Sequence, residues 1–398
     1  MANNFTFYSP TEVVFGKGVQ TEAGAYIKKY HGNRVLIVYQ GDEILKNGFM
    51  DEILRSLKEE GIFFEFLGGV LPNPYLSKVY EGIEVGKRLN LDFILAVGGG
   101  PVIDTAKAIA YGLAEPETDV WTLFEHIRTA KKCLPIGSVI TNIVAGSETS
   151  KETVITNERT REKRAYGDSL ARLKFAIMNP ERTLTLSDHQ TQSGCVDIMM
   201  HTMERYFTNG GNMEITDVIA EGLLKTVMKN AKILHHDPQN YEARAEIMWA
   251  GSLSHNNLTG CGNNGGDFAT HMLEHEVGGM FDVTNGAGLA AIWPHWARYV
   301  YKHALPRFSR FALEVMNIEA QGDMEEIALK GIEAMEEFYH SIDMPTNFKE
   351  LGIYPTDEQL NDMAARCAWA AGGLQGSAKI LFKKDMYEIY KMANSTGR

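Results

Sequence analysis

Cysteine is scarce in this chain, and so are long apolar runs. The four cysteines lie far apart and form no Cys-x-x-Cys pair, so the pattern favours neither a disulfide-stapled fold nor a cysteine zinc site. No apolar run reaches the ~18 residues that a transmembrane helix needs. The polar, aromatic start of the chain lacks the basic and apolar segments of a signal peptide. We therefore expect a cytoplasmic protein with no membrane partner.

Positive charge is also in short supply. The 39 Lys and Arg residues face 51 Asp and Glu residues, a formal net charge of −12, and basic residues form no block of five or more. This balance argues against nucleic acid as a partner. The 44% apolar and 23% charged residues are typical of globular proteins and exclude a disordered or fibrous chain. A length of 398 residues predicts two domains, with three left open.

The two halves of the sequence differ in their periodicity. Short apolar runs at 34–39, 63–67 and 92–97 alternate with helical patterns at 50–60 and 75–89. This alternation predicts parallel strands with crossover helices, an α/β domain with a doubly wound sheet over residues 1–182. The 179–182 segment is a candidate hinge, and a cleft between two domains is the default place for a ligand. An all-α domain is predicted over residues 183–398, with helices at 194–208, 215–234, 241–258, 268–280, 324–341 and 357–371.

A glycine turn follows the third predicted strand. Gly98, Gly99 and Gly100 precede Pro101 and Asp104, where a helix begins. Glycines let the backbone approach a pyrophosphate, and a helix N-terminus supplies N–H donors and partial positive charge. The turn is not Gly-x-Gly-x-x-Gly, and Pro101 offers a phosphate neither a hydroxyl nor an N–H. An ordinary βα turn, with Pro101 at the first helical position, therefore stays open.

Two further loops follow predicted strands. The 141–150 loop contains Thr141, Ala145 and Ser150, and its small and hydroxyl residues suit either a ligand or an ordinary loop. Asp42 follows the 34–39 strand, where this fold meets the adenine ribose. A carboxylate there accepts hydrogen bonds from the ribose 2′-OH and repels a 2′-phosphate, which predicts NAD(H) rather than NADP(H). A solvent-facing turn is the alternative for Asp42.

Two helical pairs suggest a metal site. Asp197 and His201, and likewise His271 and His275, are four residues apart, so each pair shares one helix face. A carboxylate together with imidazoles suits divalent zinc or iron. Taken singly, each histidine also suits a hydrogen-bonded interior position.

Collinear motifs give the chain a specific resemblance. It resembles the iron-dependent alcohol dehydrogenase family, in particular the butanol dehydrogenase-like branch, from the 7–18 segment to the 281–290 segment. The resemblance implies a dinucleotide-binding α/β domain, a helical metal domain and a homodimer. It also implies metal-assisted hydride transfer between NAD(P)(H) and a small alcohol or aldehyde. The motifs that carry it are Gly98-Gly99-Gly100 with Asp104 and Lys107, Gly146-Ser147-Glu148, Asp197 with His201, and His271 with His275.

The resemblance also implies roles for individual residues. Asp197, His201 and His271 match three metal ligands, and Asn285 falls at the fourth. His275 matches a histidine beside the nicotinamide, and Lys163 matches a lysine that approaches the cofactor ribose. The expected cofactor contacts are Asp42, Gly98, Gly99, Gly100, Pro101, Asp104, Thr141, Ala145, Ser150, Lys163 and Leu186.

Four departures from the family pattern fall in the expected site. Asn285 replaces a histidine ligand, Pro101 a serine, Ala145 a threonine and Ser150 an asparagine. A neutral amide oxygen is a poorer ligand for zinc or iron than imidazole, which predicts a weakly bound metal. We therefore hold two hypotheses: a metal-dependent NAD(P) alcohol dehydrogenase, or a catalytically impaired or inactive homologue that keeps the fold. A relative with different chemistry, such as a metal-dependent lyase, is a further alternative.

Overall fold

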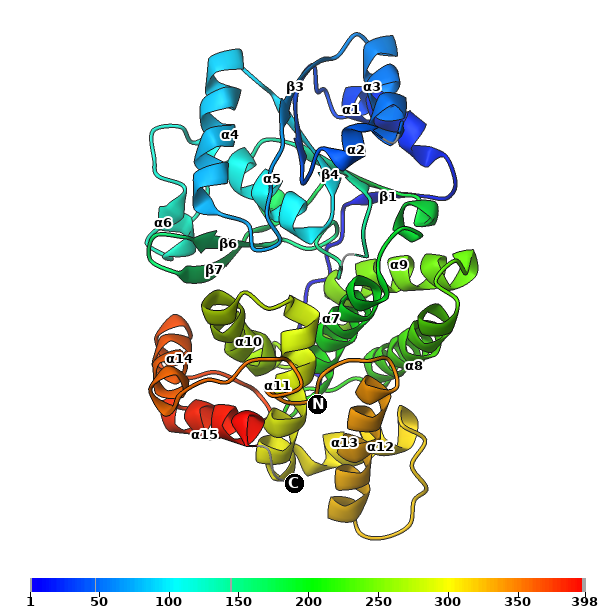
Figure 1. Ribbon diagram of the computed structural model, residues 1–398, viewed down its shortest axis with the longest axis vertical. Helices are drawn as coiled ribbons and strands as arrows, with labels where there is room; N and C mark the ends of the chain where they lie inside the picture. Colours follow the sequence, from blue (N-terminus) through cyan, green and yellow to red (C-terminus); the bar gives the residue numbers. More distant parts are fainter. Residues whose placement is uncertain (1, 47, 144, 396–398) are drawn as a thin grey trace. The chain divides into compact units, whose positions relative to one another are not determined.

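The computed structural model describes residues 2–46, 48–143 and 145–395. The chain divides into two compact units (Figure 1). One runs from Tyr8 to Thr185, and the other comprises the chain from Leu186 onward together with the residues before Tyr8. None of the described helices is both long and apolar enough to cross a membrane.

The first unit is built on a parallel sheet, as the sequence predicts, and this sheet has six strands. The four inner strands are apolar and buried almost throughout, which is typical of parallel strands that are covered on both faces. The strand order is β1 (Glu12–Phe15), β8 (Phe175–Met178), β5 (Ile136–Ile140), β4 (Phe93–Gly98), β2 (Arg34–Tyr39) and β3 (Phe63–Leu67).

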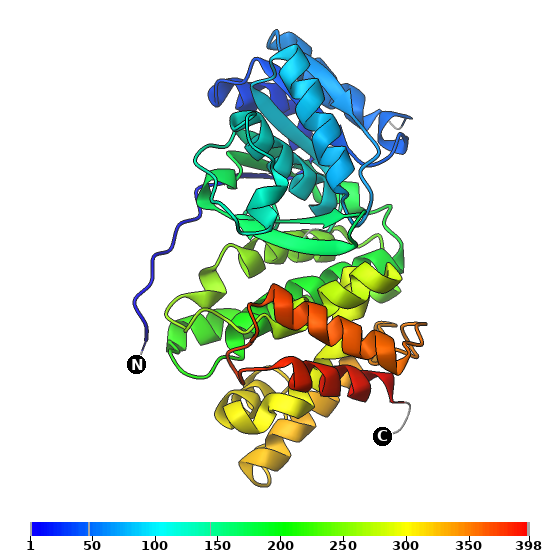
Figure 2. The ribbon, with the colours of Figure 1, turned by 90° about the vertical axis from the view of Figure 1, so that its left-hand side faces the viewer.

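Helices cover both faces of this sheet. Helices α1 (Ala23–Lys29) and α3 (Phe49–Glu59) pack on one face, where Ile27 and Ile53 meet the alternate strand residues Ile37 and Leu95. Helices α4 (Leu76–Leu89) and α5 (Gly100–Ala114) pack against each other on the opposite side, as Figures 1 and 2 show. The doubly wound α/β class is thereby confirmed.

The carboxyl ends of the parallel strands share one edge of the sheet. Tyr39 at the end of β2 lies opposite Val97 near the end of β4, and Gly98 lies opposite Ile140 at the end of β5. The strand order reverses direction between β2 and β4, because β3 follows β2 on one side and β5 follows β4 on the other. Ligands of open α/β sheets bind beside such a switch point.

A small antiparallel hairpin supplements the sheet. Strands β6 (Glu152–Asn157) and β7 (Glu162–Gly167) pair with each other, and β6 contacts α5. Two single-turn helices, α2 (Glu43–Lys46) and α6 (Trp121–Phe124), complete the unit.

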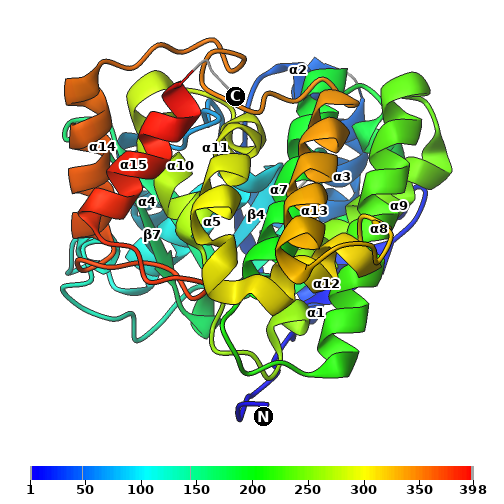
Figure 3. The same ribbon diagram turned by 90° about the horizontal axis from the view of Figure 1, so that it is seen from below.

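The second unit is helical, as predicted. Ser187 and Gln190 form a capping box that begins its first long helix, α7 (Asp188–Tyr206). Its core contains a cluster of buried aromatic rings around Phe207, among them Trp293, Trp296 and Phe308. Figure 3 shows this unit from below. The other helices are α8 (Glu214–His236), α9 (Tyr241–His255), α10 (Ala269–Phe281), α11 (Asn285–Val300), α12 (Leu305–Glu314), α13 (Met324–His340), α14 (Asp357–Ala370) and α15 (Lys383–Asn394).

Candidate metal and cofactor sites

Helix α7 presents a carboxylate and an imidazole to the same point. Asp197 and His201 lie one turn apart, and His201 Nε2 is 3.9 Å from Asp197 Oδ1. Glu204 follows on the same helix face and is buried. The spacing of four and then three residues places all three side chains on one stripe of the helix.

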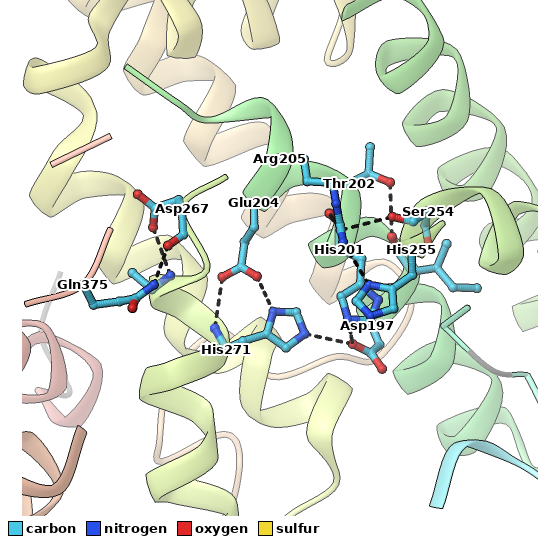
Figure 4. A network of polar contacts seen from close by, with 12 residues as sticks. Asp197, His201, Thr202, Glu204, Arg205, Ser254, His255, Asp267, His271 and Gln375 are labelled. Carbon is cyan, nitrogen blue, oxygen red and sulfur yellow. Dashed lines mark hydrogen bonds and ion pairs between the residues drawn. The ribbon is translucent and has the colours of Figure 1, made fainter. Parts of the chain in front are cut away.

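Helix α10 adds His271 to this point (Figure 4). His271 Nε2 lies 3.3 Å from Asp197 Oδ1, and its Nδ1 is hydrogen-bonded to the Glu204 carboxylate. The backbone N–H of His271 also donates to Glu204 Oε1 at 3.0 Å. Glu204 therefore fixes the ring so that Nε2 faces Asp197, the carboxylate–histidine arrangement that is common behind metal ligands.

The three side chains offer a set of donors for one cation. Asp197, His201 and His271 each supply one ligand atom, and these atoms all lie within 4.8 Å of one another. A carboxylate oxygen with two imidazole nitrogens suits zinc or divalent iron. The buried Nδ1 of His201 has no hydrogen-bond partner, so the protein does not otherwise engage this ring nitrogen. The donor set therefore fits a divalent metal.

Ionisation at this cluster follows from burial and from the paired carboxylates. Burial opposes the charged form of His271, but Glu204 and Asp197 outweigh it and raise its pKa to about 10. Burial, together with the neighbouring His255, lowers the pKa of His201 well below its usual value, so this ring is neutral. Burial would raise the pKa of Asp197, but His201 and His271 hold it below the usual value. A cation held by these side chains would therefore have to displace a proton from His271 but none from His201.

Asn285 is brought to the same cluster by close helix packing. It is the first residue of α11, and its side chain is hydrogen-bonded to Asp197. The next residue, Gly286, touches α7: a Cβ there would lie 1.9 Å from the backbone oxygen of Ser193. Only glycine permits this approach. The residue that the resemblance places at the fourth ligand position thus lies beside Asp197.

The sequence analysis missed three neighbours of the cluster: Glu204, described above, and the pair His255 and Arg205. His255, the last residue of α9, stacks on His201 with ring centroids 3.8 Å apart. Arg205 contacts both residues of this stack: its Nη2 lies 3.2 Å from His255 Nδ1, and its Nη1 donates to the carbonyl of His201. The spacing of Arg205 from His201 was a usable signal, but nothing in the sequence links His255 to position 201.

His275 lies one turn beyond His271 on α10. The two rings are nearly perpendicular, with centroids 6.4 Å apart. A separate group of possible ligands, Asp188, His235 and Asp343, lies elsewhere in the helical unit and is more exposed.

The glycine turn lies at the end of β4, at the switch point of the sheet. A Cβ on Gly98 would lie 2.6 Å from Val102, and one on Gly99 would lie 3.1 Å from Asn142, whereas Gly100 faces open space. Close packing therefore explains the first two glycines, and the third leaves the backbone accessible. Pro101 is the second residue of α5 rather than its first, because the helix begins at Gly100.

Most of the other expected cofactor residues follow the carboxyl ends of the sheet strands, and Lys163 lies on the β6–β7 hairpin. Thr141 follows β5, and its N–H donates to the carbonyl of Gly98 at 3.2 Å. Ala145 and Ser150 lie in the loop that follows, and Lys163 lies on β7. Both carboxylate oxygens of Asp104 are hydrogen-bonded within the protein, to Ser147 and Val154.

Asp42 and Leu186 complete the set. Asp42 is exposed, three residues beyond the end of β2, and accepts a hydrogen bond from Tyr39. Its position beside the glycine turn follows from the pairing of β2 with β4. Leu186 is the first residue of the helical unit after Thr185 and is partly buried.

Comparison with known proteins agrees with this arrangement. Residues 10–180 match the model of the iron-containing alcohol dehydrogenases, and residues 191–394 match that of the C-terminal region of the same family. The chain is 38% identical to an NADH-dependent butanol dehydrogenase A of Clostridium acetobutylicum, over 98% of this chain and 99% of that protein. It is 34% identical to an NADPH-dependent aldehyde reductase of Escherichia coli, over 88% of this chain and 90% of that protein.

A solved structure gives the same result. The NADH-dependent butanol dehydrogenase A of Thermotoga maritima superposes with a TM-score of 0.95 at 37% identity, covering 99% of both chains. Both family models and full-length similarity therefore agree with the resemblance carried by the motifs. The chain belongs to the iron-containing alcohol dehydrogenase family, in its butanol dehydrogenase-like branch.

Proposed function

We propose that this protein is an oxidoreductase that transfers a hydride between NAD(H) and a small alcohol or aldehyde, assisted by a divalent metal. The observation that carries the proposal is the convergence of Asp197, His201 and His271, with Glu204 behind His271. Relatives that are named as NADH-dependent butanol dehydrogenases support the substrate class. In the reducing direction, one hydride passes to the carbonyl carbon and one proton to the carbonyl oxygen.

Asp197, His201 and His271 would hold the metal, and Asn285 would complete the set through its amide oxygen or through water. A divalent cation bound there supplies Lewis acidity that polarises the substrate oxygen. In the structure the Asn285 side chain is hydrogen-bonded to Asp197, and its neutral amide oxygen is a poorer ligand for zinc or iron than imidazole. We therefore infer that zinc or iron is held weakly.

NAD(H) is the proposed cofactor, and the strand order supports its location. The pyrophosphate is proposed to lie over Gly98, Gly99 and Gly100, and the adenine ribose beside Asp42. Pro101, Asp104, Thr141, Ala145, Ser150, Lys163 and Leu186 are proposed to line or support the rest of the cofactor site. The preference over NADP(H) rests on Asp42, since relatives of both kinds exist.

His275 is the proposed catalytic residue. It lies one helical turn beyond the ligand His271, and an imidazole there suits transfer of the proton that accompanies hydride transfer. The homodimer and the cytoplasmic location expected from the sequence remain predictions.

The test is oxidation of NADH by butanal with full-length protein in excess Zn²⁺ or Fe²⁺. We expect turnover in the wild type and its loss in His271→Ala, while His236→Ala, a change at the end of α8, leaves it unchanged. A metal-loaded wild type that oxidises no NADH with butanal or other short aldehydes would instead support the catalytically impaired homologue.

A further inference from the structure

Residues 147–151 form turns and bends, and Glu152 is the first residue of β6. Buried cations bind the carbonyls of this 147–152 segment. The fully buried Lys107 on α5 donates from Nζ to the carbonyls of Ser147 and Glu152, both at 2.7 Å, and of Ser150 at 3.2 Å. The Ser150 hydroxyl lies 3.3 Å from the same Nζ. One ammonium group therefore organises both ends of this segment.

A second cation holds the middle of the segment. Arg172, which lies just before β8 and is buried, donates from Nη1 to the carbonyl of Thr149 at 2.5 Å. Lys107 and Arg172 together bind four of the six carbonyls between Ser147 and Glu152. The segment is thus fixed from two different elements of the same unit.

Asp104 adds a third connection between α5 and this loop. Its Oδ1 accepts a hydrogen bond from the Ser147 hydroxyl at 2.9 Å, and its Oδ2 accepts one from the N–H of Val154 at 3.1 Å. The backbone carbonyl of Asp104 accepts from the Thr153 hydroxyl at 2.8 Å. Asp104 and Lys107 lie in the first two turns of α5, directly after the glycine turn.

Burying an ammonium group is costly unless its donors are all bound, and an apolar side chain would fill the same space at lower cost. What the ammonium adds is a defined position for the loop relative to the glycine turn. The geometry points to Lys107, together with Arg172, as a positioning residue for cofactor binding. The two side chains fix the position of the loop that carries Ala145 and Ser150 relative to the glycine turn Gly98–Gly100, without touching the cofactor. This inference rests on the proposed binding of NAD(H).

The test combines NADH affinity with hydrogen exchange in the full-length Lys107→Met variant. Loss of the ammonium group should raise the Kd for NADH about tenfold or more, equivalent to about 1.4 kcal/mol, and speed amide exchange in residues 147–154. Ile27→Ala is the matched control, because it destabilises the same unit from α1, on the other face of the sheet. We expect this control to lower the melting temperature and leave the Kd for NADH unchanged.

Two milder variants cover the case in which Lys107→Met does not fold. Ser147→Ala removes one link to Asp104, and Arg172→Met removes the bond to Thr149; each should weaken NADH binding and speed exchange in the same segment. Equal Kd values in the wild type and in the folded variants would overturn the inference, as would unchanged exchange of residues 147–154. A wild type that binds no NADH would refute the proposed function, whereas the exchange measurement would still test the loop connection.

Discussion

We expect Asn285 to be the residue that most directly limits metal affinity at the proposed site. It lies beside Asp197, where a third imidazole would complete a set of four ligands, and its amide offers only a neutral oxygen. We expect Asn285→His to raise metal affinity at least 10–100-fold, since changes even behind the ligands typically have effects of about that size. Elemental analysis after dialysis against Zn²⁺ and then metal-free buffer measures this difference.

The control for this experiment is His235→Ala, which changes the separate Asp188–His235–Asp343 group and should leave occupancy at the Asp197–His201–His271 site unchanged. Equal, full metal occupancy in the wild type and in Asn285→His would show that Asn285 does not weaken metal binding.

Protonation of His271 should make metal binding depend on pH. The pKa of His271 is raised to about 10, because Glu204 and Asp197 outweigh the effect of burial. Below that pH the cation must displace the Nε2 proton, so apparent affinity should rise about tenfold for each pH unit between about 6 and 9. Competition titration with a chromophoric chelator measures the slope. A flat profile over this range would mean that His271 does not ligate through Nε2.

At the scale of elements, the sequence predicts the parts with strong periodicity. The ends of strands β2, β3 and β4 and of helices α3 and α4 were predicted to within about one residue. These strands are short continuous apolar runs, and the apolar residues of these helices repeat about every 3.6 residues. The β6–β7 hairpin was missed, because charged residues such as Glu152, Lys163 and Arg164 interrupt its pattern. Helix α11 was missed because Gly286, Gly288 and Pro294 disfavour a helix, and only burial against neighbouring helices sustains it.

The candidate metal site could also be predicted only in part from the sequence. The four-residue spacings identify Asp197, His201, His271 and His275 from helix geometry, whereas the position of Asn285 came only from family resemblance. The contact of Glu204 with His271 and the stack of His255 on His201 depend on how α7, α9 and α10 pack, which no local pattern reveals.

The loop after β2 should set the choice of cofactor. In the proposed site the adenine ribose lies beside Asp42, whose carboxylate would repel the 2′-phosphate of NADPH, so we expect NADH to bind more tightly than NADPH. Asp42→Asn removes this repulsion and should lower the ratio of the Kd for NADPH to the Kd for NADH about tenfold. A tenfold change corresponds to ~1.4 kcal/mol of charge repulsion. Fluorescence titration with both nucleotides measures the ratio. The neighbouring Glu43→Gln is the control, and tighter binding of NADPH by the wild type would contradict the prediction.

At the scale of the whole molecule, the two units divide the chemistry. The α/β unit carries the glycine turn, Asp42 and the loop held by Lys107, and the helical unit carries the metal cluster with His275. The proposed cofactor residues of the α/β unit are oriented by packing within that unit, and the metal cluster is oriented by packing within the helical unit. The proposed binding of nucleotide and of metal should therefore be separable by mutation: Lys107→Met should spare metal content, and His271→Ala should spare NADH affinity.

The central claim is that hydride transfer depends on a metal held by Asp197, His201 and His271, and one titration tests it directly. Full-length protein stripped with a chelator is titrated with Fe²⁺ or Zn²⁺ while NADH oxidation by butanal is followed. We predict negligible turnover without metal and a rise that saturates at about one bound ion per chain, in the single site that these ligands form. Turnover by the stripped, metal-free protein at the rate of the loaded protein would contradict the account.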